Sequence, residues 1–320
     1  THEPQHLNAR RGLVGVYRTR GDVESLSEAL WELADLSDDR EEKVACFTEA
    51  AAILRDTLRD VDRARSIEIR LQSIDPGNAA AFERRLDDAA EAQEWNEVLD
   101  LFATAATTTR PGGHAVARAA EARFRLGNTS EALAGFAYAD ALAAPGISWR
   151  VVWVTALTQS QQHHQQAATL ARQLLADPSL SGSQRCELNT CVAHACLALG
   201  NPTAASNALK AALSAVPDHL PAVAAMSLAH RAAGRLADAV AWKWTAFDRS
   251  SNEADKVSHA LEIFSWVRDE AQDLLAARTV IVHALEHFPT SPALLHALLK
   301  PVSYTHLRAH ETKANLVCRL

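Results

Sequence analysis

Cysteines are the first candidates for chemistry in this sequence, but their spacing is unfavourable for it. Cys186, Cys191 and Cys196 are five residues apart, so neighbours on one helix would point about 140° apart. A tetrahedral metal site usually needs ligand pairs two to four residues apart and a second such pair. Together with Cys46, these residues are typical of small buried side chains in a reduced cytoplasm.

Histidines and paired carboxylates give no stronger signal. His283 and His287 have the i, i+4 spacing of two ligands on one helix face, but no glutamate or third ligand accompanies them. Neither a GxSxG nucleophile turn nor a glycine-rich phosphate loop occurs in the sequence. The acidic pairs Asp38–Asp39 and Asp87–Asp88 lie in charge-rich stretches, which are typical of solvated faces. We therefore expect no cofactor, no metal and no enzymatic activity.

The elements that would position any functional residue are marked by small side chains at a nearly fixed interval. Successive intervals are 38, 34, 34, 35, 38, 34 and 38 residues. This is the length of one helix–turn–helix unit, and such self-similarity is typical of a stacked solenoid. We call these residues the anchors: Leu26, Ala64, Val98, Ala132, Ala167, Ala205, Ala239 and Ala277.

The unit around Ala132, RAAEARFRLGNTSEALAGFAYADALAAP, shows the common pattern. Gly127 can adopt the left-handed conformation that ends a first helix, and residues 128–130 can cap a second. Phe136 and Ala139 follow the anchor at +4 and +7, on one helix face. Pro145 then ends the unit.

This pattern resembles the tetratricopeptide repeat over about residues 20–300, in a degenerate form. The resemblance implies an all-α, right-handed α-solenoid of about eight repeats, in which residues 1–19 form a partial repeat or cap. The glycine turn is replaced at Arg59, Gln93 and Gln162, and units of 38 residues imply lengthened first helices. The linker 107–115 offers a hinge at Gly112–Gly113, but the 34-residue interval continues across it and favours an ordinary turn.

The C-terminal residues 301–320 need a separate interpretation. VSYTHLRAHETKANLVCRL resembles the translation of a sequencing-library adapter, so we expect this tail to be non-native. Of the 32 Lys and Arg and 39 Asp and Glu residues, the tail holds Arg308, Lys313, Arg319 and Glu311. The remaining 29 basic and 38 acidic residues give a net charge of −9, which argues against binding to nucleic acid or anionic lipid. No apolar run approaches the roughly 20 residues of a membrane span.

The resemblance also implies where a partner would bind, because first helices line the concave groove of such solenoids. Counting back from the anchors gives an acidic stripe of Glu83, Asp87 and Glu91, which predicts a basic segment on the partner. It also gives two aromatic candidates, Trp149 and Trp266, whose residue type dominates many interfaces, although core packing or ordinary exposure fits each position as well as partner contact does. The other groove positions are His114, Glu121, Arg125, Gln159, Glu187, His194, Arg231, His259 and Glu262.

The sequence therefore predicts a protein–protein interaction scaffold that presents a groove to a protein or peptide. One alternative is a regulatory or sensor arm of a larger signalling or transcription protein whose effector domain lies elsewhere. Another is an assembly or secretion scaffold at the cell envelope, which a signal peptide before Thr1 would indicate. The excess of Arg over Lys favours a bacterial origin, and the cysteines favour the cytoplasm. The sequence does not specify the oligomeric state.

Overall fold

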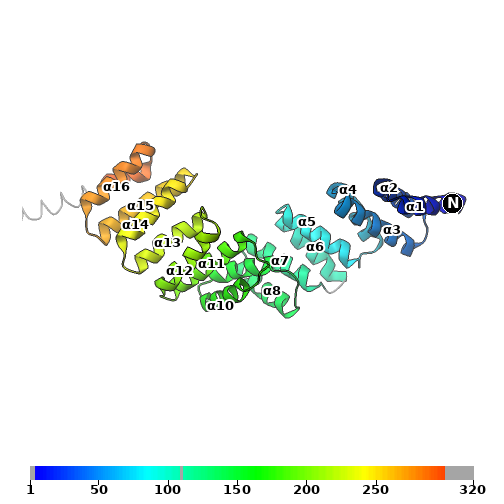
Figure 1. The fold of residues 1–320 in the computed structure, drawn as a ribbon, viewed down its shortest axis with the longest axis horizontal. Helices are drawn as coiled ribbons and strands as arrows, with labels where there is room; N and C mark the ends of the chain where they lie inside the picture. Colours follow the sequence, from blue (N-terminus) through cyan, green and yellow to red (C-terminus); the bar gives the residue numbers. More distant parts are fainter. Residues whose placement is uncertain (1–3, 109–110, 300–320) are drawn as a thin grey trace, which may run out of the picture. The chain divides into compact units, whose positions relative to one another are not determined.

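Every regular element in the described part of the chain, residues 4–108 and 111–299, is helical in this computed structural model (Figure 1). Odd-numbered helices are the first, or A, helices of each pair, and even-numbered helices are the second, or B, helices. The A helices are α1 (Pro4–Arg20), α3 (Arg40–Ala52), α5 (Ala79–Glu91), α7 (Gly113–Arg125), α9 (Ser148–Gln159), α11 (Gly182–Ala198), α13 (Leu220–Ala232) and α15 (Glu253–Asp269). The B helices are α2 (Val23–Leu36), α4 (Val61–Ile74), α6 (Trp95–Thr108), α8 (Thr129–Ala141), α10 (His164–Leu175), α12 (Pro202–Ala215), α14 (Leu236–Arg249) and α16 (Leu274–His287). Residues 292–299 are also helical.

Each anchor is the fourth residue of its B helix, which confirms the periodicity found in the sequence. Leu26 is 6% exposed and the other seven are fully buried. A small side chain one turn into the helix lets the helix axes approach closely, which is why the same position carries Ala in six of the eight pairs. The predicted all-α repeat of helix pairs is confirmed.

The turn before each B helix has one conformation in nearly all pairs. The residue five positions before the anchor has a positive φ at seven of eight turns. Glycine occupies four of these, including Gly127 at 89°, whereas Arg59, Gln93 and Gln272 reach 58°, 60° and 56°. Gln162 is the exception, since it is not among the left-handed residues. Arg59 and Gln93 therefore replace glycine, as predicted, but keep the left-handed turn conformation that glycine has at the equivalent positions.

The 38-residue intervals arise from longer A helices, as the sequence implied. α11 and α15 each have 17 residues, whereas α5, α7 and α13 have 13. The third long unit continues α3 with a π-helical segment, η1 (Ile53–Thr57). Four additional residues are close to one helical turn, so the lengthened helices keep their packed face in phase.

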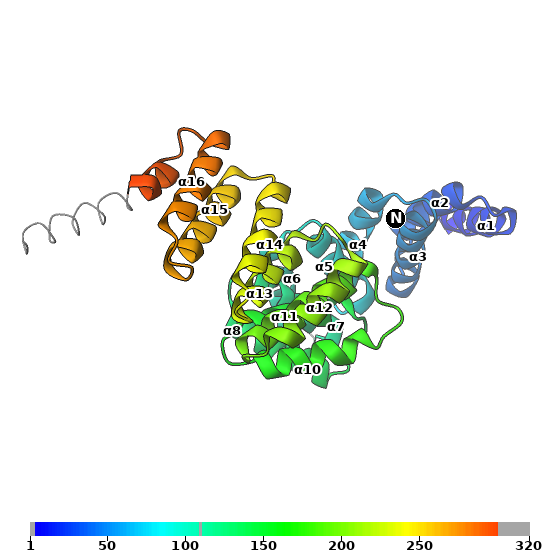
Figure 2. The same cartoon turned by 60° about the vertical axis from the view of Figure 1, so that its left-hand side comes forward.

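The chain divides into two compact units, residues 1–153 and 154–320, with the boundary inside α9. In the first unit, one core joins the buried faces of α1 to α5 and another joins those of α5 to α7. In the second unit, Phe247, Phe264 and Ile281 centre a core that α14, α15 and α16 share. Figure 2 shows the antiparallel helix pairs of each unit from a second direction.

Three segments singled out by the sequence can now be placed. α1 forms a full helix against α2, where the sequence suggested a partial repeat or cap over residues 1–19. In the linker 107–115, a Cβ on Gly113 would lie 3.0 Å from the Cβ of Ala144, so close packing alone favours glycine there. The tail 301–320, including Cys318, lies outside the described residues. Among the described helices, none combines the length and the apolar character that crossing a membrane requires.

Candidate partner-binding surface

An interlocked group of charges lies on the A helices α5 and α7. Asp87 lies 2.9 Å from Nε2 of His114 and accepts a 2.7 Å hydrogen bond from Nε of Arg118. Burial alone would raise the pKa of Asp87, but the hydrogen bond from His114 and the charge of Arg118 lower it. The same hydrogen bond raises the pKa of His114 against the effect of burial. Asp87 is therefore an anion held in place by a histidine and an arginine.

Glu121 and Arg125 continue this group along α7. Glu121 is 7% exposed and accepts a 3.2 Å hydrogen bond from Arg118, while Arg125 lies 3.6 Å from its other oxygen. The guanidinium of Arg125 also lies 5.8 Å from the ring centre of Trp95, within cation–π range. Glu121 acts as a buried link, and Arg125 is the exposed end of the group.

The acidic stripe expected from the sequence has a different character in the structure. Glu83 is half-buried and Glu91 is exposed, and neither forms an ion pair among the described residues. Asp87, between them, is already neutralised by His114 and Arg118. The stripe therefore offers two unpaired carboxylates. The solvated-face interpretation of Asp87–Asp88 is wrong, because each carboxylate pairs with a different arginine.

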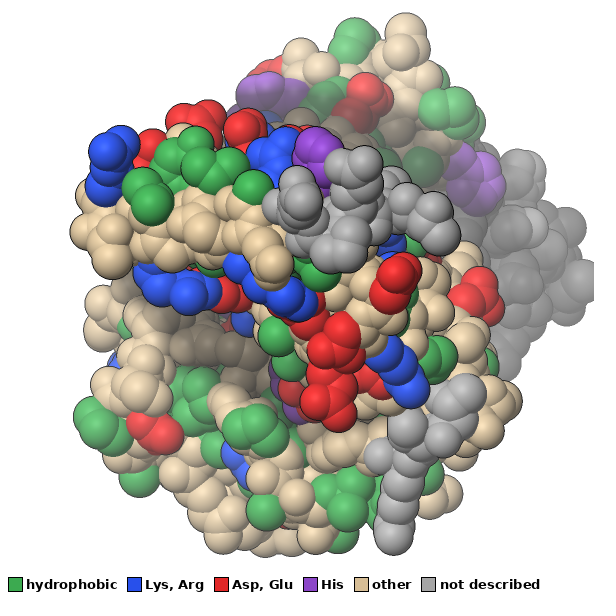
Figure 3. Space-filling model, turned by 90° about the vertical axis from the view of Figure 1, so that its right-hand side faces the viewer, with side chains coloured by type: hydrophobic (Ala, Val, Ile, Leu, Met, Phe, Trp, Pro, Cys, Tyr) green, Lys and Arg blue, Asp and Glu red, His purple; other side chains and the backbone are tan. Residues whose placement is uncertain are grey.

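Ion pairs between successive A helices recur along the chain, and we call them the A-helix ion ladder. Their partners lie 31 to 39 residues apart, which is about one repeat. The pairs are Arg11–Glu42 at 2.7 Å, Arg18–Glu49 at 2.7 Å, Arg55–Asp88 at 2.6 Å, Arg118–Asp87 at 2.7 Å and Arg231–Glu270 at 2.6 Å. On the face shown in Figure 3, basic, acidic and hydrophobic side chains accordingly lie interspersed. Sequence analysis missed the ladder, although opposite charges one repeat apart were a usable signal.

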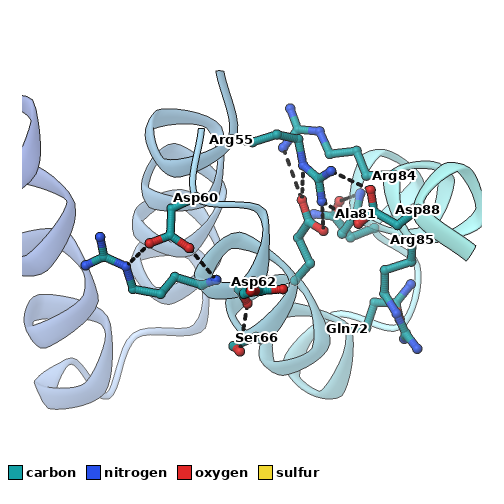
Figure 4. A network of polar contacts seen from close by, with 12 residues as sticks. Arg55, Asp60, Asp62, Ser66, Gln72, Ala81, Arg84, Arg85 and Asp88 are labelled. Atoms are coloured by element: carbon teal, nitrogen blue, oxygen red, sulfur yellow. Dashed lines mark hydrogen bonds and ion pairs between the residues drawn. The ribbon is translucent and has the colours of Figure 1, made fainter. Parts of the chain in front are cut away.

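The most buried part of the ladder surrounds Arg55 in η1 (Figure 4). Its guanidinium lies 2.7 Å from Glu68 of α4 and 2.6 Å from Asp88 of α5, and it donates to both oxygens of each carboxylate. Glu68 is fully buried, and this burial raises its pKa even though Arg55 opposes the shift. Arg84 lies 3.8 Å from the same carboxylate. The cluster joins three helices, and its groups are occupied by one another.

Trp149 is in the core, which is the alternative to a groove contact that the sequence left open. It is 5% exposed and stacks on Phe136 and Trp153, with ring centres 6.3 and 6.1 Å away. Its indole N–H donates a 2.9 Å hydrogen bond to the carbonyl of Pro145. Helical periodicity alone cannot distinguish a buried tryptophan from an exposed one at this position.

Trp266 is equally buried, at 4% exposed, and two cations cover its ring. The guanidinium of Arg231 lies 4.9 Å from the ring centre and Nζ of Lys243 lies 5.5 Å from it. Lys243 pairs with Glu262 at 2.8 Å, and Arg231 pairs with Glu270. The structure therefore brings Arg231, Glu262 and Trp266 together, as the groove prediction required, but with the aromatic ring covered.

Of the remaining predicted contacts, Gln159 of α9 is exposed, and His259 of α15 is half-buried with a pKa that burial lowers. The last two, Glu187 and His194, lie on α11. Glu187 is exposed, whereas His194 is half-buried and burial lowers its pKa. The three cysteines of this helix and Cys46 are all buried, as expected, and are free thiols. His283 and His287 lie edge to face, 5.4 Å apart, and no group of three metal-ligating side chains occurs in the described part of the chain.

Hollows lie between successive B helices, where the sequence suggested nothing. They occur at α2/α4, α6/α8, α12/α14 and α14/α16, with volumes of about 390, 410, 450 and 510 Å³. Each contains an aromatic side chain: Trp31, Phe102 with Tyr138, Trp242 and Trp244, respectively. The A helices α5 and α7 contact each other directly, as do α11 and α13. At α5/α7 and α11/α13 the A helices are thus in contact, while hollows lie between the neighbouring B helices α6/α8 and α12/α14.

No protein-family model and no curated protein matches this chain. Solved structures do. The C-terminal part of a TPR repeat-containing protein from Cytophaga hutchinsonii has a TM-score of 0.54 at 11% identity, over 78% of this chain and 98% of that one. A tetratricopeptide repeat protein from Parabacteroides merdae has a TM-score of 0.51 at 15% identity, over 80% and 97%. The fold is that of tetratricopeptide-repeat proteins.

A third likeness extends further along this chain. The APC/C hetero-tetramer Cut9–Hcn1 has a TM-score of 0.52 at 14% identity, over 94% of this chain and 60% of that one. At these identities the tetratricopeptide likeness concerns the fold. The function must be argued from the surfaces described above.

Proposed function

We propose that this chain is a protein-interaction scaffold that binds a protein or peptide on its helical surface. The observation that carries the proposal is the interlocked group of charges on α5 and α7. Asp87, Arg118 and Glu121 hold one another in place, so binding orders few side chains and its entropic cost is small. Arg125, Glu83 and Glu91 remain accessible around this fixed centre.

The chemistry of the surface fits binding better than catalysis. Asp87, Arg118 and Glu121 on the A helices are occupied by one another, and the hollow between α2 and α4 combines apolar side chains with carboxylates. Glu83 and Glu91 favour a partner with basic residues, because each is an unpaired carboxylate next to a neutralised Asp87. Spreading contacts over several repeats would give affinity without a deep pocket.

Selection of peptides from a random display library on the purified full chain tests this proposal. We expect enriched peptides that bind reversibly, with one class weakened by the double change Glu83→Lys and Glu91→Lys and by added salt. The matched control is Glu41→Lys with Glu253→Lys, which has the same charge change at exposed sites elsewhere. Failure to enrich any peptide would overturn the proposed function.

A further inference from the structure

The hollow between α2 and α4 combines an apolar floor with an acidic rim. Trp31, Leu54 and Ile67 form the floor, and the small side chains of Ser27 and Ser66 leave the space above it open. Its volume of about 390 Å³ is in the range of pockets that bind ligands. Because Ile67 is 2% exposed and Leu54 is 3% exposed, the floor is a fixed part of the core.

The floor is held in place by aromatic packing beneath it. Trp31 meets Phe47 edge to face, with ring centres 5.5 Å apart, and the guanidinium of Arg70 lies 5.4 Å from the Trp31 ring centre. Arg70 is itself held by Asp35 at 2.6 Å. The hollow is therefore preformed, and an entering side chain would meet a rigid surface.

Two carboxylates, Glu28 and Glu32, line the rim of the hollow, and Glu24 lies one turn before them on α2. Glu24, Glu28 and Glu32 follow one another at intervals of four on α2, which places them along one side of the helix. Glu32 pairs with Arg10, whereas Glu24 and Glu28 are exposed and form no ion pair among the described residues.

The cation on the opposite side of the hollow is already occupied. Arg63 of α4 binds the carboxylate of Asp60, which also caps the start of the same helix. The charges of Glu24 and Glu28 also act on Arg63, but the carboxylates of Glu24, Glu28, Glu32 and Asp60 outnumber the cations Arg63 and Arg10, so the net charge at the mouth of the hollow is negative.

We propose that this hollow is a docking site for a protein segment that carries a bulky apolar side chain flanked by Lys or Arg. The apolar side chain fills the space over Trp31 and Ile67, and the flanking cations pair with Glu24 and Glu28. A helix that binds in a hydrophobic groove is held by apolar anchor side chains of this kind. The inference rests on the proposed scaffold function and assigns a second surface to it, on the B side of the first unit.

The test compares the peptides selected above on two tryptophan variants. Ser66→Trp fills the hollow from an exposed position on α4, so the helix pair should still form. Ser73→Trp is the matched control, because it is exposed on the same helix two turns further on and does not line the hollow. We expect one peptide class, rich in an apolar residue next to Lys or Arg, to lose affinity about tenfold or more on Ser66→Trp only. Circular dichroism checks that both variants are helical.

A charge change keeps the proposal testable if Ser66→Trp fails to fold. Glu28→Lys should weaken the same peptides and reduce the salt dependence of their binding, whereas Glu41→Lys on α3 should not. If all enriched peptides are insensitive to Ser66→Trp and Glu28→Lys, the docking site is wrong while the scaffold function stands. If no peptide is enriched on any version of the chain, both are wrong.

Discussion

Two junctions between neighbouring helix pairs differ in chemistry, since one is held by buried ion pairs and the other by apolar packing. Where α3, α4 and α5 meet, Arg55 bridges the buried carboxylates of Glu68 and Asp88. Where α11, α12 and α13 meet, Leu188, Leu209 and other apolar side chains fill the interior. Both junctions belong to units lengthened to 38 residues, so the same architecture tolerates an ionic or a hydrocarbon joint. The two junctions should differ in their response to substitution. Removing one member of a buried ion pair leaves an uncompensated buried charge, so it lowers the free energy of unfolding more than removing one apolar contact does.

Removing Arg55 should give the largest effect. Arg55→Met leaves Glu68 buried without its main partner and should lower the free energy of unfolding by about 3–5 kcal/mol. The double change Arg55→Met and Glu68→Met should recover part of this loss, because the fully buried carboxylate is removed with its partner and only the less buried Asp88 stays without Arg55. Urea denaturation followed by circular dichroism measures both. A loss within about 1 kcal/mol for the single variant would show that the cluster is not a stabilising joint.

At the apolar junction, a larger anchor should have the next largest effect. Ala205 is fully buried at the fourth position of α12, so Ala205→Leu should overpack the joint and cost about 1–3 kcal/mol. Ala211→Leu is the control, because Ala211 is exposed on the same helix. The same denaturation experiment applies. Equal stability of the two variants would remove the argument that small anchors set the helix spacing.

Substitutions in the turns before the B helices should change the free energy of unfolding by a smaller amount, with opposite signs at Gln93 and Gly200. Gln93 has a φ of 60°, so Gln93→Gly should raise the free energy of unfolding by about 1 kcal/mol, because a non-glycine residue is strained there. Gly200 has a φ of 74°, so Gly200→Ala should lower it by about 1 kcal/mol. Thermal unfolding of both variants gives the two signs, and a shift in the same direction for both would contradict the explanation.

The smallest effect should be a pH dependence confined to α5 and α7. The pKa of His114 is raised in the folded chain by its hydrogen bond to Asp87, against burial and the charge of Arg118. The stabilisation is therefore complete below the unfolded pKa of about 6.5 and is lost as pH rises through the raised folded value. Hydrogen exchange at α5 and α7 should show less protection at the higher pH, after correction for the intrinsic rate. His114→Gln should abolish this difference, and its persistence in that variant would assign it to another group.

The sequence predicted the stacking of helix pairs well because periodicity is a local signal. All eight anchors lie at one helix position, and the lengthened A helices follow from the 38-residue intervals. The prediction of groove residues did less well. Trp149 and Trp266 occupy the expected helices, but whether a side chain faces the core depends on helix rotation and on neighbours such as Phe136 and Lys243.

Pairing between distant charges was the part that the sequence analysis missed. Arg55 and Asp88 are 33 residues apart, and Asp87 and Arg118 are 31 apart. Each member looks like an ordinary solvated charge when only neighbouring residues are considered. Only the repeat length indicates that such residues meet on successive A helices, and the B-side hollows depend on side-chain volumes that no spacing rule specifies.

The constant place of the anchors has a consequence for how such a chain can vary in length. The extra residues in α11, α15 and the α3–η1 segment all lie in A helices, while every anchor stays one turn into its B helix. Insertions that add about one whole helical turn leave the contacting faces aligned, whereas two extra residues would rotate the rest of the helix by roughly half a revolution. Repeat length in this protein is therefore free to change in steps of one turn, which gives a rule for lengthening or shortening it by design.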